Sequence, residues 1–186
     1  SHSWGNHEGY VKSDNGQDDA GITQNFDQPG LVDYSYGDLP NDRRHTVKVY
    51  GQYALTDDLL LSFNTLYQSG RPVSCRGVHP TDVFAQAYGA DSFYCGGELV
   101  QRGSLGTTPD ILNVNVGAQY NMEVGDFDVL FALDVFNLFN AQNATVYNEF
   151  AETGSSYPAP SDSDYLRIRQ YQRPQYVRLS ARISFE

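Results

Sequence analysis

The sequence has 186 residues and a formal net charge of -11, with 14 Tyr, 10 Phe and 1 Trp. It contains no basic tract, which argues against a nucleic-acid partner, and no apolar run of the roughly 18 residues that a membrane-spanning helix requires. Helical periodicity is nearly absent, whereas alternation of apolar and polar residues with period two recurs along the chain. We therefore expect β-strands.

The first strongly polar stretch is SDNGQDD, residues 13–19, which contains three aspartates. Carboxylate oxygens are good ligands for calcium, but their spacing here differs from that of an EF-hand loop. Asp, Asn and Gly are also the residues that favour exposed turns. We predict a solvated turn, and calcium binding at residues 14–19 is the alternative.

Five stretches alternate over the length of a full strand. In residues 127–135 one face is apolar and the other carries Asp128 and Asp134, and in the last stretch the apolar face lies opposite Arg178 and Arg182. The opening stretch SHSWGNHEGY is a candidate remnant of a sixth strand. The five predicted strands span residues 45–55, 59–68, 110–120, 127–138 and 174–185.

The connections between these strands alternate in length. Residues 56–58 and 121–126 are read as short turns, and the long connections cover about 5–44, 69–109 and 141–172. Unstructured loops longer than about 12–15 residues are uncommon in compact soluble domains. Short turns at one end, long loops at the other and strands of about 9–11 residues are typical of bacterial outer-membrane barrels. The predicted fold is all-β, an antiparallel transmembrane β-barrel whose long loops are extracellular.

Such a barrel gives each face of a strand a direction. The charges Asp128, Asp134, Arg178 and Arg182 are predicted to face a polar lumen, either as a structural ion network or as the lining of a transport path. The residues predicted to face lipid are Phe127, Val129, Phe131, Leu133, Val135, Val177, Leu179, Ala181, Ile183 and Phe185.

The alternative fold is a soluble β-sandwich or a lipocalin-like barrel, whose strands alternate in the same way.

Several segments together resemble a known family. The penultimate strand runs into LDVFNLFNAQNATVYNE, the last strand is RPQYVRLSARISF, and YGDLPNDRRHTVKVYGQYAL precedes LLLSFNTLYQSGRP upstream. This combination resembles the carboxyl-terminal end of the TonB-dependent outer-membrane receptors, in particular their Oar-like branch. Members of the family usually end on an aromatic residue, whereas Glu186 follows Phe185 in this sequence.

The resemblance implies the carboxyl-terminal part of a 22-stranded barrel, with a plug domain and a TonB box that are absent from this sequence. Five strands cannot close a barrel, and open sheet edges are costly in lipid, so we expect the chain to be a segment of a longer protein or to receive its missing strands from elsewhere. The implied function is energy-coupled uptake of an unidentified ligand, without a cofactor, across the outer membrane of a Gram-negative bacterium. The implied partners are outer-membrane lipid and lipopolysaccharide, the rest of the barrel with its plug, and TonB through the missing upstream region.

Two other functions remain open at this point. The chain could be an outer-membrane scaffold or surface-assembly component that contacts a surface lipoprotein through its acidic loops. It could also be a soluble β-sandwich binding module.

Cys75 and Cys95 lie in the longest predicted loop. An oxidising compartment favours a disulfide between them, which would hold the loop in shape. A metal pair or a redox site is the alternative, and His79 is the only histidine nearby.

The sequence gives no sign of an active site. It has no Gly-x-Ser-x-Gly elbow and no His-Glu-x-x-His motif, and it establishes no pairing among His2, His7, His45 and His79. We therefore predict that this segment has no catalytic role.

Three arginines are expected near the extracellular rim: Arg167, Arg169 and Arg173. There they would meet lipopolysaccharide or an acidic ligand.

Overall fold

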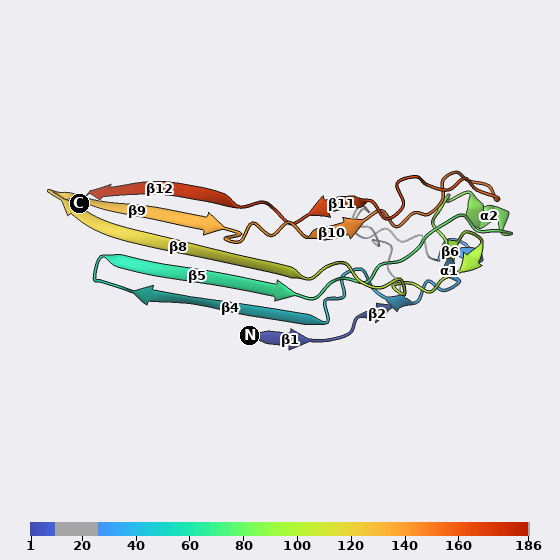
Figure 1. The fold of residues 1–186 in the computed structure, drawn as a ribbon, viewed down its shortest axis with the longest axis horizontal. Helices are drawn as coiled ribbons and strands as arrows, with labels where there is room; N and C mark the ends of the chain where they lie inside the picture. Colours follow the sequence, from blue (N-terminus) through green and yellow to red (C-terminus); the bar gives the residue numbers. More distant parts are fainter. Residues whose placement is uncertain (10–25, 186) are drawn as a thin grey trace.

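The structure is a computed structural model that describes residues 1–9 and 26–185. Its main element is one six-stranded antiparallel sheet in the order β1-β4-β5-β8-β9-β12 (Figure 1). The five predicted strands are present, and the opening stretch supplies the sixth. The strands are β1 (His2–Trp4), β4 (His45–Ala54), β5 (Leu59–Gln68), β8 (Ile111–Val124), β9 (Phe127–Phe136) and β12 (Tyr176–Phe185).

Several strand boundaries differ from the prediction by one to four residues, and two of these differences have a clear backbone cause. The six-residue turn expected at 121–126 is wrong, because β8 continues to Val124 and pairs there with Phe127. Gly125, at a φ of 64°, lets the chain reverse within two residues. Strand β9 ends at Phe136, earlier than predicted, because Asn137 has a φ of 52° and leaves the extended conformation.

The small elements lie at the opposite end of the sheet from the tight turns (Figure 1). We call this part the loop region; it comprises the described residues within 5–44, 69–109 and 141–172. No helix of the described residues is long and apolar enough to cross a membrane. The small elements are β2 (Glu8–Gly9) paired with β3 (Gly37–Asp38), β6 (Tyr94–Cys95) with β7 (Glu98–Leu99), β10 (Ala144–Tyr147) with β11 (Ile168–Tyr171), and the helices α1 (Pro29–Val32) and α2 (Val83–Gln86).

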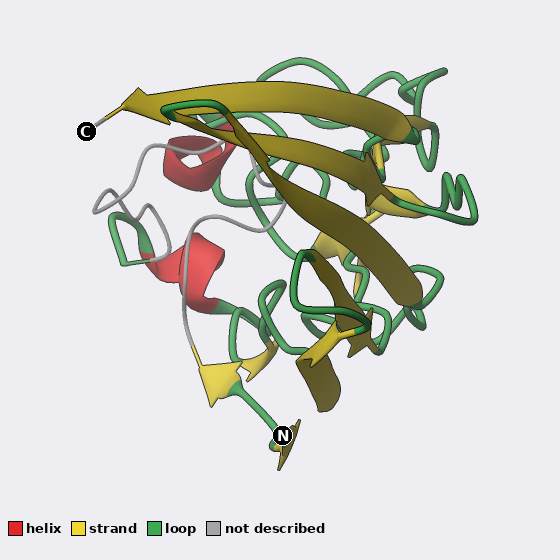
Figure 2. Cartoon of the chain, turned by 90° about the vertical axis from the view of Figure 1, so that its left-hand side faces the viewer, coloured by secondary structure: helices red, strands yellow, loops and turns green. Residues whose placement is uncertain are grey.

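The strand register aligns the apolar faces of the five long strands. Directly opposed pairs share a face, so the apolar face of each predicted strand merges with that of its neighbour. Seen from the turn end, the sheet is an open curved surface that does not close on itself (Figure 2). One row across five strands consists of Tyr53, Leu61, Ala118, Leu133 and Leu179.

The buried apolar side chains are not in this sheet. They lie in the loop region, whereas Leu179 and Phe185 on β12 are 78% and 77% exposed. Contiguous apolar surface of this kind marks a face that contacts a partner or a membrane. The buried apolar residues are Leu31, Val73, Cys75, Val78, Ala85, Phe93, Ala144 and Val146.

The predicted turn at residues 13–19, with its alternative as a calcium site, lies outside the described residues.

Candidate functional site: a polar sheet face and the loop region beside it

The second face of the sheet carries a polar row. Arg178 donates to one carboxylate oxygen of Asp134 from Nε at 3.1 Å and from Nη2 at 2.8 Å. A Cβ atom at Gly117 would lie 2.8 Å from Asp134 Oδ1 and 2.7 Å from Ser62 Oγ, so the absence of a side chain there lets these groups lean together. The row reads Gln52, Ser62, Gly117, Asp134 and Arg178.

The four predicted lumen charges share this polar face, but only two of them are directly opposed. Asp134 lies opposite Arg178, whereas Asp128 lies opposite Ser184 and Arg182 lies opposite Leu130. Asp128 and Arg182 are therefore diagonal neighbours across the ladder. Whether this face borders a lumen stays a prediction.

A groove of about 650 Å³ has the Asp134–Arg178 pair in its lining. Its polar lining combines a neutralised ion pair with amide groups and a phenol, so it offers hydrogen bonds without a strong net charge. The polar residues that line it are Tyr50, Gln52, Ser62, Asn64, Asn115, Asp134 and Arg178.

Buried charges hold the loop region together. Arg71 donates from Nη2 to Glu149 Oε1 at 2.6 Å, and both side chains are almost fully buried, at 5% and 1% exposure. The second oxygen of Glu149 accepts the backbone N–H of Ser74 at 3.1 Å, and Nε of Arg71 donates to the carbonyl of Thr145 at 3.2 Å. The connection after β5 is thus bound to the connection after β9.

Two further arginines extend this buried network. Arg76 pairs with Asp91, and its guanidinium lies 5.9 Å from the ring centroid of Phe93. Arg102 lies 4.7 Å from the same centroid and donates to the carbonyl of Ser35. The ring of Phe93 is therefore flanked by two cations, which is a favourable arrangement for a buried guanidinium.

A disulfide joins Cys75 to Cys95, with 5.7 Å between their Cα atoms. The predicted bridge is confirmed, and the alternative of a metal pair or redox dithiol at these cysteines is set aside. The bridge ties the segment around Cys75 to strand β6, which contains Cys95.

Removing this disulfide is expected to lower the stability of the loop region by about 3 kcal/mol, because the open chain regains the entropy that the bridge removes. Amide hydrogen exchange across residues 75–95 measures the effect in the full-length protein with and without a reducing agent. The double variant Cys75→Ala, Cys95→Ala is the control, and reductant should leave its exchange unchanged. Equal exchange of the oxidised and reduced wild-type protein would contradict the expectation.

The NLFN sequence that ends β9 ties three strands together. The backbone N–H of Asn137 donates to Asn115 Oδ1 at 2.9 Å, and its side-chain amide donates to the carbonyl of Arg173 at 2.7 Å. Asn140 Oδ1 accepts the backbone N–H of Gln175 at 3.0 Å. This motif therefore fixes the entry of the chain into β12, a role that its place at the end of a strand did not reveal.

Two of the predicted rim arginines lie on or next to β11. Arg167 is exposed and pairs with Asp164 at 2.8 Å. The pKa of Asp162 lies below its usual value, because the backbone N–H of Asp164 and the side chain of Asn148 donate to its carboxylate and because Arg169 and Arg167 are close. Facing lipopolysaccharide or an acidic ligand stays a prediction for these arginines.

Sequence reasoning missed the contacts of the histidines. The Nε2 atom of His2 lies 3.3 Å from Nδ1 of His45, on the neighbouring strands β1 and β4. Nδ1 of His7 lies 3.1 Å from Oδ1 of the buried Asp42. Both pairs join residues more than thirty positions apart, so no local spacing could have indicated them.

The fold and this arrangement define a class of protein. The chain is all-β, with one open antiparallel sheet that is apolar on one face and polar on the other, and with its long connections gathered at one end. This is the pattern that barrel walls in the outer membrane follow.

One relative among the known proteins agrees with this class. No protein-family model matches the sequence. The chain is 32% identical over 163 residues to the TonB-dependent transporter Oar of Myxococcus xanthus, which covers 84% of this chain and 14% of that protein. Among solved structures it is similar to the ferric citrate transporter FecA in the unliganded form, with a TM-score of 0.44, 11% identity, and coverage of 82% of this chain and 18% of that one.

The chain is therefore related to the TonB-dependent transporters, and the predicted resemblance to their Oar-like branch is confirmed. The relationship is to transporters and not to enzymes, in agreement with the prediction of no catalytic role. TonB-dependent transporters are outer-membrane proteins that interact with TonB. The chain spans about one seventh of the length of the Oar protein that it matches.

Proposed function

We propose that this chain is a segment of the barrel wall of a TonB-dependent outer-membrane transporter that takes up a ligand by energy coupling. It supplies the carboxyl-terminal strands of a barrel of about 22 strands, and the rest of the protein supplies the remaining strands, the plug and the contact with TonB. The homology to the Oar transporter supports the family. The ligand is not identified by these features.

The single observation that carries the proposal is the uncovered apolar face of the sheet. Its rows of large apolar side chains remain exposed, and within the described residues no second sheet packs against them. In water such a face would be unfavourable, whereas the hydrocarbon of a membrane covers it at no cost. The same observation argues against the soluble β-sandwich, whose apolar face is covered by a second sheet.

The other face and the loop region take their roles from this orientation. Asp128, Asp134, Arg178 and Arg182 then line the lumen, where charged side chains remain hydrated. The loop region lies outside the cell, where oxidising conditions preserve the bridge between Cys75 and Cys95. The rim arginines Arg167, Arg169 and Arg173 are then placed to meet lipopolysaccharide phosphates.

Fractionation of cells that produce the full-length protein tests the proposal. An antibody against residues 69–109 should detect it in the outer membrane, soluble only in detergent, with an intact mass several times the 20.8 kDa of this chain. Recovery of a stable protein in plain buffer would overturn the membrane assignment. A mature outer-membrane species of about 20.8 kDa would instead favour the scaffold or surface-assembly role, which needs no plug.

A further inference from the structure

His79 lies inside the loop region and is only 5% exposed. The backbone nitrogens of Asp82 and Thr81 lie 2.8 Å and 3.1 Å from its Nδ1 atom. A backbone N–H group can only donate, so Nδ1 accepts both bonds and the proton of the neutral ring is on Nε2. The observed contacts therefore require a neutral imidazole in one defined tautomer.

These two bonds shape the turn that leads into α2. Asp82 begins the helix, and its Oδ1 accepts the backbone N–H groups of Phe84 and Ala85 at 2.9 Å and 3.3 Å. The side chain of Gln86 returns to the carbonyl of His79 at 2.8 Å. The imidazole thus lies within the segment 79–86 that it orders.

Helix α1 packs on the same point. A Cβ atom at Gly30 would lie 2.7 Å from Asp82 Oδ2 and 2.8 Å from Cδ2 of His79. Only glycine allows α1 to approach this closely, so a movement of the ring or of Asp82 would disturb the contact between the two helices. Figure 1 shows α1 and α2 side by side at the end of the molecule farthest from the tight turns.

The charged and titratable groups that face His79 come from three elements. Asp33, which follows α1, places Oδ2 at 3.9 Å from Nε2, and Asp82 lies beside the ring. Tyr94 of β6 packs its ring at 4.5 Å from that of His79, edge to face. The two carboxylates attract an imidazolium, whereas a proton on Nδ1 would place a third N–H group against those of Thr81 and Asp82.

We propose that His79 is a proton-sensitive clasp for α2. Neutral His79 holds the segment 79–86 against α1. Uptake of a proton from solvent at Nδ1 removes the acceptor of both backbone bonds, while Asp33 and Asp82 balance the new charge. Acidification then releases the segment, with the exposed side chains of Val83 and Phe84.

Amide hydrogen exchange of the full-length protein in detergent tests the clasp. With labelling times corrected for the intrinsic rate at each pH, a peptide covering residues 79–88 should exchange about tenfold faster at pH 5.5 than at pH 7.5, because two hydrogen bonds are lost. A peptide covering residues 144–152 reports on the rest of the loop region and should not change. An unchanged 79–88 peptide in the wild-type protein would overturn the proposal.

Two neutral variants separate the proton from the acceptor. Asn in His79→Asn places an amide oxygen near the position of Nδ1 and does not titrate, so the peptide should stay protected at both pH values. His79→Gln carries its oxygen one bond farther out, and its peptide should exchange fast at both. A pH response that persists in His79→Asn would refute the clasp, and so would full protection in His79→Gln.

Discussion

Replacing Glu149 by glutamine is expected to destabilise the loop region by about 3 kcal/mol, the lower end of the range for breaking a buried ion pair. Glu149 balances the charge of the buried guanidinium of Arg71, and it also accepts the backbone N–H of Ser74. Glutamine keeps the shape and one acceptor oxygen but removes the negative charge. The positive charge of Arg71 then remains at a buried site and loses the balancing charge of Glu149, which solvent cannot replace there.

Amide hydrogen exchange of residues 71–76 and 145–150 in the full-length protein measures this loss. Asp164→Asn is the matched control, since it removes the charge of the Arg167–Asp164 pair, whose side chains are 71% and 44% exposed. An exposed pair contributes about 0 to 1 kcal/mol, so this control should change little. Equal effects of the two substitutions would mean that the Arg71–Glu149 pair does not hold the two connections together.

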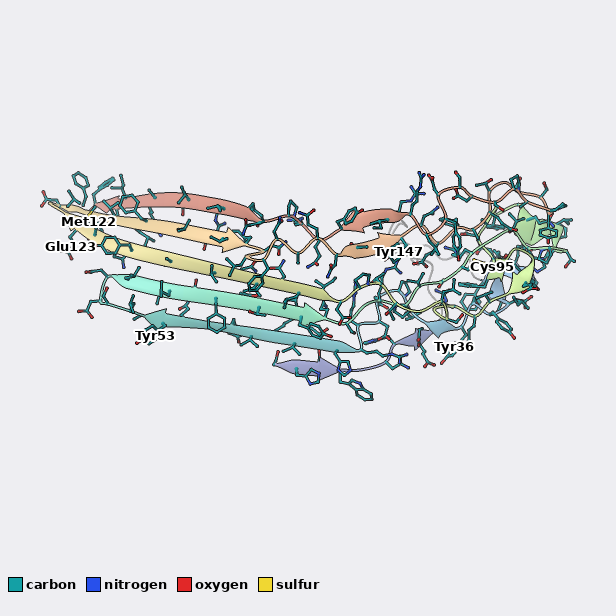
Figure 3. All side chains as sticks on the ribbon, in the orientation of Figure 1. Tyr36, Tyr53, Cys95, Met122, Glu123 and Tyr147 are labelled. Carbon is teal, nitrogen blue, oxygen red and sulfur yellow. A yellow bond between two sulfur atoms is a disulfide. The ribbon has the colours of Figure 1, made fainter. Side chains whose placement is uncertain are left out.

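The sheet could be predicted from the sequence because the alternation that marks each strand lies within the residues of that strand. Side chains alternate with period two along each strand, and apolar residues such as Leu133 and Leu179 meet only when the register aligns those faces. The extension of β8 was missed because Asn121 and Glu123 read as turn residues. In the structure they occupy the polar face of a strand, and the two residues Gly125 and Asp126 make the turn (Figure 3 labels Glu123 close to this turn).

The loop region was not predictable in the same way. Arg71 and Glu149 are 78 positions apart, and nothing in their neighbourhoods distinguishes them from exposed charges. Cys75 and Cys95 could be paired because the chain has only two cysteines. The burial of His79 against the turn it orders depends on a backbone conformation that composition does not reveal. Long-range polar contacts of this kind can be identified only from a three-dimensional structure, whereas the alternating faces of a strand can be identified from the sequence.

The distribution of buried and exposed residues reverses the usual arrangement. Charged side chains such as Arg71, Arg76 and Glu149 are buried in the loop region, while aromatic and aliphatic side chains on the sheet are exposed. The two observations have one physical explanation if the sheet borders lipid, because lipid then replaces the covering layer that a water-soluble sheet requires. Under the same proposal the loop region lies above the membrane and must form its own compact interior, and the ion pairs and the disulfide would serve that purpose.

Replacing Leu133 by arginine is expected to cost about 2–4 kcal/mol, because the proposed orientation puts this residue near the middle of the hydrocarbon layer. Leu133 lies in an apolar row, between Ala118 and Leu179. Ala132 is its neighbour in the chain but points to the opposite face, where it lies between Gln119 and Ser180. Ala132→Arg is therefore the matched control and should cost far less, because its charge would enter the polar side of the wall.

The stability of each variant is read from the urea concentration at which the folded, heat-modifiable form of the full-length protein is lost in lipid vesicles. Phe131→Arg repeats the test one row away, since Phe131 lies opposite Ala181 on the same apolar face. If the three substitutions shifted the midpoint equally, the two faces would meet the same surroundings and the proposed orientation would fail. A larger loss at Ala132 than at Leu133 would reverse it, with the carboxylate of Asp134 facing lipid. The reversed orientation has the higher free energy of the two, because it would also expose Arg178 and Arg182 to hydrocarbon.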